Sequence, residues 1–495
     1  MGKTVLFALT NDYTHYCLSY AFQKQYDCKM YAISEVTSRP KIFFKNQKLV
    51  NFEKIWFLHD NIKKRISKPD IQYLENFEKK YRINLWKLVQ NERIFLYYKN
   101  FHRFSSDEML NILEQECRFF EKILDDIKPD FFFTRMTSLH HQELLYQMCK
   151  NSGVKVVAMN YTLLGGKCML SKEHETFDNI SELKNLEFID RSFDELQKYL
   201  NSFDLVKQLY KTQIKPGGGN LEKLSSMKEY MLNFDSDNID THYTYYGRTK
   251  TKVFTHYLKD FFTIKSRQSF IDKTLEQSLT FDYSFVYFPL HTEIERATLI
   301  GAPYHLNQIE LIKNIAKSLP INFKLVVKEH PGQINRSWRS ESDYNEIMNI
   351  PNVILYHPNF SKDLLYKNCS IVFTIAGTSG FEAACYGKPS ITMVDLNYSI
   401  LPSVFTLTNF TELHDLIKKL LLVKVSSDDV NKFLTLFEKN VSNFDWNEFT
   451  TKITNEFFSG RIQDSEINES QMKSFLEKNL NELIPFANEH VAKIS

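Results

Sequence analysis

The residues best suited to bind an anion lie in the sequence GTSGFEAACYGKP, which begins at Gly377. The run before it, SIVFTIA (370–376), is short, apolar and β-branched, which predicts a buried strand. FEAACYG then predicts a short helix. The turn between them leaves unpaired backbone N–H groups at the helix start, including that of Gly380, and Thr378 and Ser379 add hydroxyl donors. An ordinary helix cap is the alternative interpretation, because Ser and Thr commonly cap helices.

Polar residues also follow two earlier predicted strands. The strand SFVYFPL is followed by His291 and Glu295, and the strand FKLVVK ends at Lys328 and is followed by His330 and Pro331. The C-terminal ends of parallel strands lie along one edge of a sheet, so we expect these residues to meet the small-residue turn there. A lysine, a histidine donor, two hydroxyls and a helix start at one edge suit a phosphate or diphosphate.

Two further residues extend this predicted anion site. Arg336 follows His330 by a few residues and is expected to add a bidentate phosphate contact. Glu382 lies in the first turn of the predicted helix and is a candidate acceptor for ribose hydroxyls. A favourable interaction with the helix dipole is the alternative role for this carboxylate.

The first third of the chain predicts another parallel α/β region. A helix opens at Ser105 with one-sided apolar spacing and ends before Pro129, and strands are expected at 4–10, 54–59, 130–135 and 154–160. Asp12 and His15 lie in the loop after the first strand, where ligands gather in open α/β sheets. Alternatively, Asp12 caps the next helix and His15 is solvated.

His140 and His141 are adjacent in a predicted helix. Adjacent side chains on a helix diverge by about 100°, which argues against a facial metal pair. We therefore expect a structural or solvent-exposed role for both.

Composition and charge narrow the classes of function. Basic and acidic residues nearly balance, at 62 and 60, which argues against a dedicated nucleic-acid binder. The seven cysteines form no CxxC pair and no zinc-type spacing, which favours reduced thiols over a disulfide framework. No apolar run is long enough to span a bilayer, and the N-terminus lacks the long apolar region of a signal peptide. A cytoplasmic protein is expected, with peripheral docking at the inner face of the membrane left open.

The remaining segments carry weaker signals. IKPGGGN (214–220) predicts a loop, and Asp235-Ser236-Asp237 resembles a DxD metal motif but is expected to be a solvated loop. Segment 254–277 mixes aromatic and basic residues at helical spacing. Packing against a neighbouring domain is favoured over a membrane-surface role. Residues 426–495 predict helices and no strand.

Four stretches closely resemble the bacterial capsular polysaccharide biosynthesis family: FPLHTEIERATLIG, LVVKEHPGQINR, TIAGTSGFEAACYGKP and YSILPSV. The family pattern runs FPLH, Pro-Glu, a Gln in the next helix, VKEHP with a later Arg, a GT(A/S)G turn ending in GKP, and Y-x-x-LP-x-V. The matching residues here are Glu295, Gln308, Lys328, His330, Pro331, Arg336, Thr378, Ser379, Glu382, Lys388 and Tyr398. The chain departs at Ile294, where the family usually has Pro. The resemblance is strong over 281–404 and looser over 128–166.

This resemblance implies an α/β, GT-B-type fold, in which two Rossmann-like domains face a cleft. A helical insert and a helical C-terminal extension are expected from the sequence pattern alone, since neither segment matches the family pattern. We expect an acceptor domain, an insert, a nucleotide-sugar-binding domain and the extension at 1–171, 172–280, 281–425 and 426–495.

Members of the family include retaining β-Kdo transferases that use CMP-Kdo. The His-Pro and Ser/Thr elements are also similar to those that hold CMP in bacterial sialyltransferases. The resemblance therefore implies a glycosyltransferase that moves a sugar, such as Kdo or another CMP-activated acidic sugar, to a surface polysaccharide or glycolipid. UDP-sugars are the second donor class. The alternatives are a CDP-glycerol-type polyol-phosphate transferase and a non-catalytic scaffold for capsule assembly.

Catalytic roles follow from this hypothesis. Asp12, His15 and Glu295 are candidates for the base or nucleophile at the anomeric carbon, although Glu295 is also a candidate to hold the donor. A protonated His330 would offset charge on the leaving phosphate. No metal is expected, because side chains and a helix start supply the positive potential.

Overall fold

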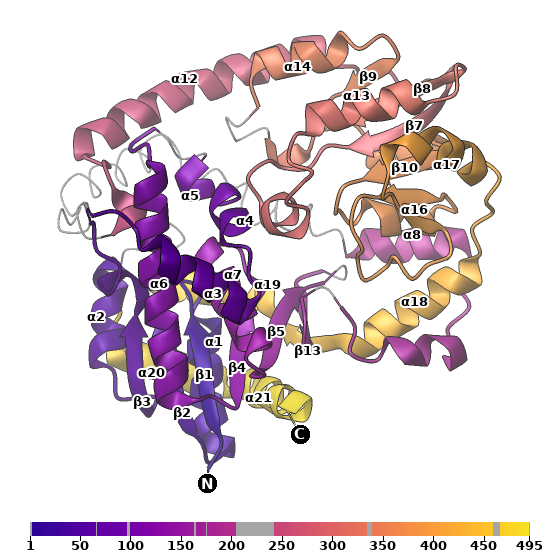
Figure 1. The fold of residues 1–495 in the computed structure, drawn as a ribbon. Coiled ribbons are helices and arrows are strands. Elements are labelled where there is room, and N and C mark those ends of the chain that lie inside the picture. The colour runs from indigo at the N-terminus through magenta and orange to yellow at the C-terminus, as the bar shows by residue number, and fades with distance from the viewer. Residues whose placement is uncertain are drawn as a thin grey trace. The chain divides into compact units, whose positions relative to one another are not determined.

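The computed structural model describes residues 2–65, 67–96, 100–162, 165–174, 176–203, 242–333, 339–458 and 466–494 (Figure 1). The chain divides into two compact units. The first comprises Met1–Asp178, Phe203–Val253 and Asn440–Ser495, and the second comprises Asn179–Ser202 and Phe254–Lys439. Arg336, the predicted Pro-Gly-Gly-Gly loop and the Asp235-Ser236-Asp237 motif lie outside the described residues.

The first unit is built on a seven-stranded sheet in the order β13-β6-β5-β4-β1-β2-β3. The five strands from β5 to β3 in that order are mutually parallel. The strands are β1 (Thr4–Leu9), β2 (Lys29–Ser34), β3 (Phe52–Phe57), β4 (Phe131–Arg135), β5 (Lys155–Tyr161), β6 (Lys167–Ser171) and β13 (Val441–Asp445). The four strands predicted in this region are confirmed to within a few residues.

Helices cover both faces of this sheet. The helices are α1 (Thr14–Gln25), α2 (Ser38–Asn46), α3 (Ile71–Tyr81), α4 (Leu85–Gln90), α5 (Arg93–Leu96), α6 (Ser106–Ile127), α7 (His140–Asn151), α19 (Trp446–Phe458), α20 (Glu469–Lys478) and α21 (Leu480–Ile494). Strand residues alternate between two cores: Val5 and Phe7 pack toward α1 and α19–α21, and Leu6 packs toward α3–α7. The predicted helix start at Ser105 is confirmed, with a full capping box to Glu108.

The C-terminal residues complete the first unit. Helix α21 packs against α1, and β13 pairs antiparallel with β6. The prediction that residues 426–495 contain no strand is therefore wrong. Val441–Asp445 is short, and its pairing depends on an edge strand more than 270 residues earlier, which local sequence does not reveal.

The second unit has a six-stranded parallel sheet in the order β12-β11-β10-β7-β8-β9. Its strands are β7 (Ser284–Pro289), β8 (Phe323–Lys328), β9 (Val353–Tyr356), β10 (Ile371–Thr374), β11 (Ser390–Thr392) and β12 (Val404–Thr406). Its helices are α8 (Phe193–Ser202), α12 (Lys250–Thr274, which begins in the first unit), α13 (Gln308–Ser318), α14 (Glu341–Met348), α15 (Lys362–Asn368), α16 (Ser379–Cys385), α17 (Leu413–Leu420) and α18 (Ser427–Asn440). Two parallel-rich sheets confirm the predicted α/β class.

Two predicted helices of the second unit can be compared with the structure. The sequence predicts a helix over residues 304–319. The helix begins later, at Gln308, because the Asn307 side chain caps α13 by accepting from the N–H of Glu310 at 3.1 Å. Helix α12 buries Ile271 against the core of the second unit, which agrees with packing at its C-terminal end.

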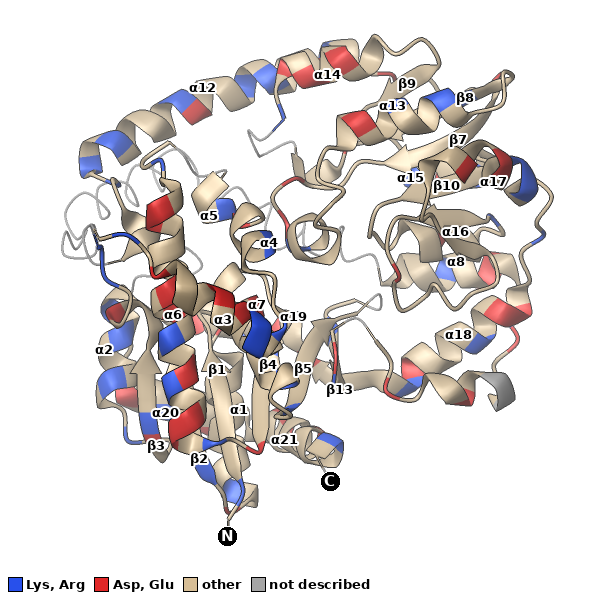
Figure 2. Cartoon of the chain, viewed as in Figure 1, with Lys and Arg blue, Asp and Glu red and all other residues tan. Residues whose placement is uncertain are grey.

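The charge distribution, the cysteines and the helices agree with the expectations from composition. Acidic and basic residues are interspersed along helices of both units, such as α6 and α12 (Figure 2). All seven cysteines are free thiols. Among the described residues, no helix combines the length and apolar character needed to cross a membrane.

Candidate functional site

Three neighbouring strand ends of the second unit carry the predicted anion-binding residues. Strands β10, β7 and β8 are adjacent in the sheet and parallel. Two hydrogen bonds join the loops that follow them: the Ala376 N–H donates to Nε2 of His291 at 3.3 Å, and the Thr292 hydroxyl lies 2.9 Å from Nδ1 of His330. The side chains expected at one edge of the sheet therefore do lie there.

His291 is fixed through both its backbone and its ring. The side-chain amide of Gln308 bonds the N–H of His291 at 2.8 Å and its carbonyl at 3.0 Å. Burial, followed by the nearby His330 and Arg339, lowers the pKa of His291 to about 4, so the ring is neutral near pH 7. Because Nε2 accepts a hydrogen bond, the proton of the neutral ring belongs on Nδ1. His291 thus acts as a fixed acceptor for the loop that leads into the turn.

Lys328 is a buried cation at the end of β8. Its residue is 5% exposed, and among the described residues its ammonium has one hydrogen-bond partner, the Glu329 carbonyl at 3.5 Å. Burial, together with the nearby Lys362, lowers the pKa of Lys328 to about 8. The attraction of Glu329 and Glu382 opposes this shift. A buried ammonium with so little pairing is costly, and an anion bound beside it would offset that cost.

The loop after Lys328 fixes the form of His330. Nδ1 of His330 accepts from the Gly332 N–H at 3.0 Å, so the Thr292 hydroxyl must donate to the same atom. The neutral ring therefore carries its proton on Nε2. Pro331 opens a short 3₁₀ turn, Pro331–Gln333, which holds this geometry.

A buried ion network that the sequence did not predict supports this loop. Glu329, which is fully buried, pairs with Arg339, accepts from the Tyr344 hydroxyl at 2.8 Å and accepts from the His330 N–H at 2.6 Å. Arg339 also pairs with Glu293 at 3.0 Å. The one available signal was an acidic residue between Lys328 and His330 at a strand end. Its partner Arg339 lies in a loop with no recognisable pattern.

The small-residue turn places Thr378 at the N-cap position of α16, but the Thr378 side chain does not cap the helix. Its hydroxyl donates to Oε1 of Glu382 at 2.8 Å, and Glu382 also pairs with Lys362 at 3.1 Å. The threonine and the carboxylate are therefore held together. Ser379 begins the helix and contacts the Tyr366 hydroxyl.

Glycine is required at Gly380 because Tyr398 packs directly against it. A Cβ built at Gly380 would lie 2.8 Å from two atoms of the Tyr398 side chain. The Tyr398 hydroxyl donates to the carbonyl of Gly377. Tyr398 therefore holds the turn in place, and a larger residue at Gly380 would fit only if the Tyr398 side chain moved.

The departure from the family pattern has a structural counterpart. Ile294 has a φ of 62°, a left-handed conformation that is rare for a β-branched residue and that proline cannot adopt. Its neighbour Glu295 accepts from the Leu299 N–H at 2.9 Å through its carbonyl, which starts the helical turn Ala297–Gly301. The segment between His291 and this turn therefore follows a backbone path that differs from one with Pro at this position.

Asp12 and His15 lie at the end of β1 in the first unit. Asp12 accepts from Arg135 at 2.7 Å, from the Thr10 hydroxyl at 3.0 Å and from the Thr14 N–H at 3.1 Å. Although burial opposes it, Arg135, His15 and the Thr14 N–H together lower the pKa of Asp12. His15 is 1% exposed, and burial lowers its pKa to about 4. Both side chains are thus placed to support the sheet edge.

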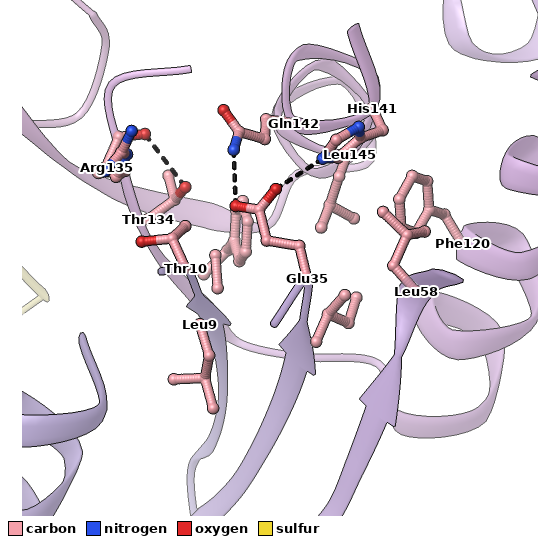
Figure 3. Close-up of a pocket in the computed structure, with 13 residues that line it drawn as sticks. Leu9, Thr10, Glu35, Leu58, Phe120, Thr134, Arg135, His141, Gln142 and Leu145 are labelled. Carbon is pink, nitrogen blue, oxygen red and sulfur yellow. Dashed lines mark hydrogen bonds and ion pairs between the residues drawn. The ribbon is translucent and has the colours of Figure 1, made fainter. Parts of the chain in front are cut away.

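A cavity opens at this edge of the first unit (Figure 3). It is small and lined mainly by apolar side chains, and it lies where β1, β2 and β4 end. The Glu35 carboxylate lines it and is oriented by Nε2 of His141 at 2.8 Å and by the side-chain amide of Gln142 at 2.7 Å. The sequence did not single out Glu35, because it follows β2, a strand that was not predicted.

Comparison with known protein families gives one match over the centre of the chain. Residues 196–401 match the capsule polysaccharide biosynthesis protein family. This match confirms the predicted family resemblance. The matched region contains the loops after β7, β8 and β10 that carry His291, His330 and Gly377. No match was found among curated proteins.

Comparison with solved structures gives matches to a β-Kdo transferase, a UDP-GlcNAc 2-epimerase and a protein bound to UDP and glucose. The β-Kdo 2,7 transferase KpsC of Thermosulfurimonas dismutans is 12% identical, with 76% of this chain and 97% of that chain covered and a TM-score of 0.32. UDP-GlcNAc 2-epimerase of Methanocaldococcus jannaschii, in complex with UDP-GlcNAc and UDP, is 11% identical, with 88% and 99% covered and a TM-score of 0.26. HepE of Anabaena, in complex with UDP and glucose, is 10% identical, with 92% and 98% covered and a TM-score of 0.25. All three TM-scores are well below 0.5, so the function proposed below does not depend on these structures.

Proposed function

We propose that this protein is a glycosyltransferase of capsule biosynthesis that binds the phosphate of a nucleotide-sugar donor at the strand ends of the second unit. The observation that carries the proposal is Lys328: a buried ammonium with one weak described partner, within the region that matches the capsule-synthesis family. A phosphate is the anion that such a site suits best, since a charge-assisted bond to a buried lysine is strong.

The proposed roles follow from the side-chain chemistry. Lys328, the Nε2–H of His330 and the hydroxyls of Thr378 and Ser379 would stabilise the negative charge that grows on the phosphate as the glycosidic bond breaks. Pro331 and Gly377 shape the two loops. These groups stabilise charge without a metal, and Arg336 is proposed as an additional phosphate contact.

The carboxylates of the second unit have separate proposed roles. Glu382 is already held by Lys362 and Thr378, which supports the proposal that it accepts a hydrogen bond from the donor's ribose rather than reacting. Glu295 remains a candidate to hold the donor sugar. CMP-sugars, including CMP-Kdo, are the favoured donors on the family resemblance, and UDP-sugars are the second choice.

The acceptor glycan is proposed to bind the first unit, near the strand ends around Glu35. An ionised carboxylate there could accept hydrogen bonds from sugar hydroxyls. Asp12 and His15, predicted as base or nucleophile, are proposed instead to position Arg135 and the loop around it, because Asp12 is fully engaged and His15 is buried.

A donor screen tests the proposal directly. Purified protein is incubated with CMP-, UDP- and GDP-sugars, and nucleotide release, phosphorus in the product and nucleotide-dependent thermal stabilisation are measured. Release of CMP or UDP with a phosphorus-free glycan product is expected. Phosphorus in the product would indicate polyol-phosphate transfer, and stabilisation without turnover would indicate a scaffold.

Two variants link the screen to the site. Lys328→Met removes the ammonium but keeps a long apolar side chain, so we expect a folded protein that does not bind the nucleotide. Lys324→Met, on the same strand, is the matched control and should bind normally. Equal binding by wild type and Lys328→Met would exclude this phosphate site.

A further inference from the structure

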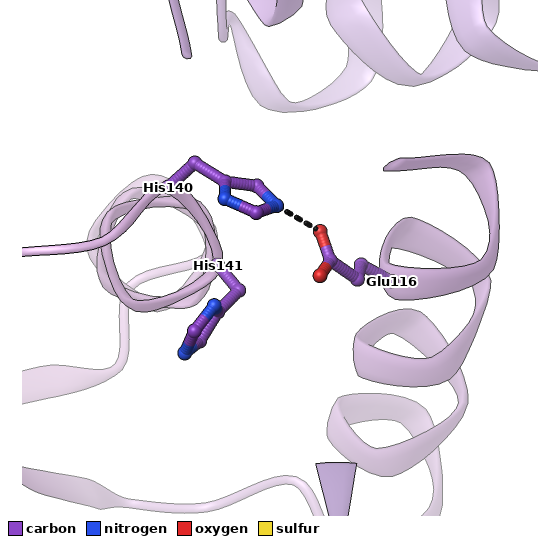
Figure 4. A group of neighbouring side chains, drawn as sticks. All are labelled: Glu116, His140 and His141. Carbon is purple, nitrogen blue, oxygen red and sulfur yellow. Dashed lines mark hydrogen bonds and ion pairs between the residues drawn. The ribbon is translucent and has the colours of Figure 1, made fainter. Parts of the chain in front are cut away.

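A second cluster of chemically active side chains lies inside the first unit. Glu116 projects from α6, and His140 and His141 from the start of α7 (Figure 4). One ligand atom from each lies within 4.8 Å of those of the other two, and all three side chains are at most 4% exposed. Their burial excludes the solvent-exposed role considered for these two histidines. Although their Cβ directions diverge, the two rings rotate so that their inner atoms approach one carboxylate.

Each histidine turns its outer nitrogen toward a different carboxylate. Nδ1 of His140 lies 2.7 Å from Glu92, and Nε2 of His141 lies 2.8 Å from Glu35. Metal-binding histidines usually have such a carboxylate partner on the nitrogen away from the metal, because it fixes the tautomer and makes the ligating nitrogen more basic. This arrangement is a second observation that points to a metal ion.

The inner atoms converge on the side chain of Glu116. Nε2 of His140 lies 2.8 Å from one Glu116 oxygen. The Tyr243 hydroxyl lies 3.3 Å from the other Glu116 oxygen and 3.2 Å from Nδ1 of His141. Two imidazole nitrogens, a carboxylate and a phenol therefore surround one small region.

The charge of the cluster favours a cation. Three carboxylates, from Glu35, Glu92 and Glu116, surround two imidazoles in a region that is almost fully buried. An unbalanced negative charge in such a place is costly.

We propose that Glu116, His140 and His141 bind a divalent transition-metal ion, with zinc best suited to two imidazoles and one carboxylate. Zinc–ligand bonds of about 2.0–2.1 Å place neighbouring ligand atoms about 3.3 Å apart. His140 Nε2 and the Glu116 oxygen, now 2.8 Å apart, would separate slightly, and ligand atoms that lie farther apart would approach. His141 also contacts Glu35, so this ion would stiffen the wall of the cavity. The site is separate from the donor chemistry proposed for the second unit.

Cobalt is a suitable probe because Co²⁺ can occupy zinc sites and absorbs visible light when it is four-coordinate. Untagged full-length protein is stripped with EDTA and titrated with Co²⁺, and the melting temperature is measured with and without Zn²⁺. We expect saturation at one ion per chain, displacement of Co²⁺ by Zn²⁺, and a higher melting temperature with Zn²⁺.

Three variants and a control assign the ligands. Glu116→Gln keeps the shape of the side chain and can still form hydrogen bonds, but it removes the charge. Glu116→Gln and His140→Ala, each as a single variant, should abolish the saturable cobalt spectrum. Glu92→Gln should weaken Co²⁺ binding by about 10–100-fold. His256→Ala, at a histidine of the second unit paired with Asp260, should leave binding unchanged.

Two results would overturn the proposal: wild-type protein that shows neither cobalt absorption nor zinc stabilisation, or a spectrum that persists in Glu116→Gln. Either outcome would mean that the cluster is a set of buried histidine–carboxylate pairs and not a metal site.

Discussion

The hydroxyl of Thr292 donates to Nδ1 of His330 across 2.9 Å and so ties the loop after β7 to the loop after β8. The Gly332 N–H donates to the same nitrogen. Two donors on one nitrogen hold the imidazole with its proton on the opposite side, at Nε2.

Thr292→Val should therefore impair His330 without unfolding the protein. Valine fills the same volume but cannot donate, so the ring loses one of its two anchors. We expect turnover to fall by about tenfold, equivalent to about 1.4 kcal/mol, with little change in donor binding. Steady-state kinetics check this prediction. Thr298→Val is the control and should retain activity, because among the described residues the Thr298 hydroxyl bonds only the local Glu295 carbonyl.

Donor binding should weaken as the pH rises through about 8. Burial holds the pKa of Lys328 near that value, well below the 10.5 of a free lysine, so the free protein loses the ammonium there. Nucleotide affinity should therefore be full near pH 7 and fall above about pH 8, while Lys328→Met should show weak binding without this pH dependence. Isothermal titration calorimetry across this range measures it, and a flat wild-type profile would argue against Lys328 as the phosphate ligand.

The same lysine makes folding stability depend on pH in the opposite direction. Between about 8 and 10.5 the unfolded chain holds a proton on Lys328 that the folded chain has released. The free energy of unfolding contributed by this group therefore rises with pH in that window. Urea titrations of wild type and Lys328→Met should differ in slope there, with the variant flatter.

Gly380→Ala should destabilise the turn. The added methyl would lie 2.8 Å from the Tyr398 ring, and overpacking of this kind costs about 1–3 kcal/mol. We expect a lower melting temperature and loss of nucleotide binding. Gly301→Ala is the matched control, because a Cβ there meets nothing nearer than 3.7 Å. An unchanged melting temperature in both variants would show that Tyr398 moves aside freely.

Arg339→Met should be strongly destabilising. It leaves the buried carboxylate of Glu329 without its partner, and breaking such a pair costs about 3–5 kcal/mol. Chemical denaturation measures the loss. The double variant Arg339→Met/Glu329→Gln should recover part of it, because the uncompensated charge is then removed. A double variant as unstable as the sum of both single changes would mean that the two residues are not coupled.

His15 should contribute to acid sensitivity. Its pKa falls from 6.5 to about 4 on burial, so the unfolded chain takes up a proton before the folded chain does. The stability contribution is complete above about pH 6.5 and is lost as the pH falls toward 4, by up to about 3 kcal/mol. In the His15→Gln variant, the free energy of unfolding should fall less steeply as the pH is lowered through this window. Circular dichroism against pH provides the comparison, with His414→Gln as a control.

The residues at the strand ends could be predicted from the sequence, but the buried ion pairs that hold their loops could not. Lys328, His330 and the Gly377 turn follow apolar runs that could be recognised as strands, and parallel strands place their ends along one edge. Glu329, Arg339 and Tyr344 meet only through folding, and no local pattern marks an ion pair across a loop. Glu35 was missed for the same reason as β2, because KMYAIS is short and only partly apolar.

The first unit receives its last strand and three of its helices from residues that follow the whole second unit. On a ribosome that adds about 5–20 residues each second, the edge of β6 and the apolar surface beneath α19–α21 would wait tens of seconds for their partners. An unpaired strand edge and an open apolar face are the features that chaperones bind and that promote aggregation. The order of the chain therefore makes synthesis of the first unit a period of exposure, which ends when β13 pairs with β6.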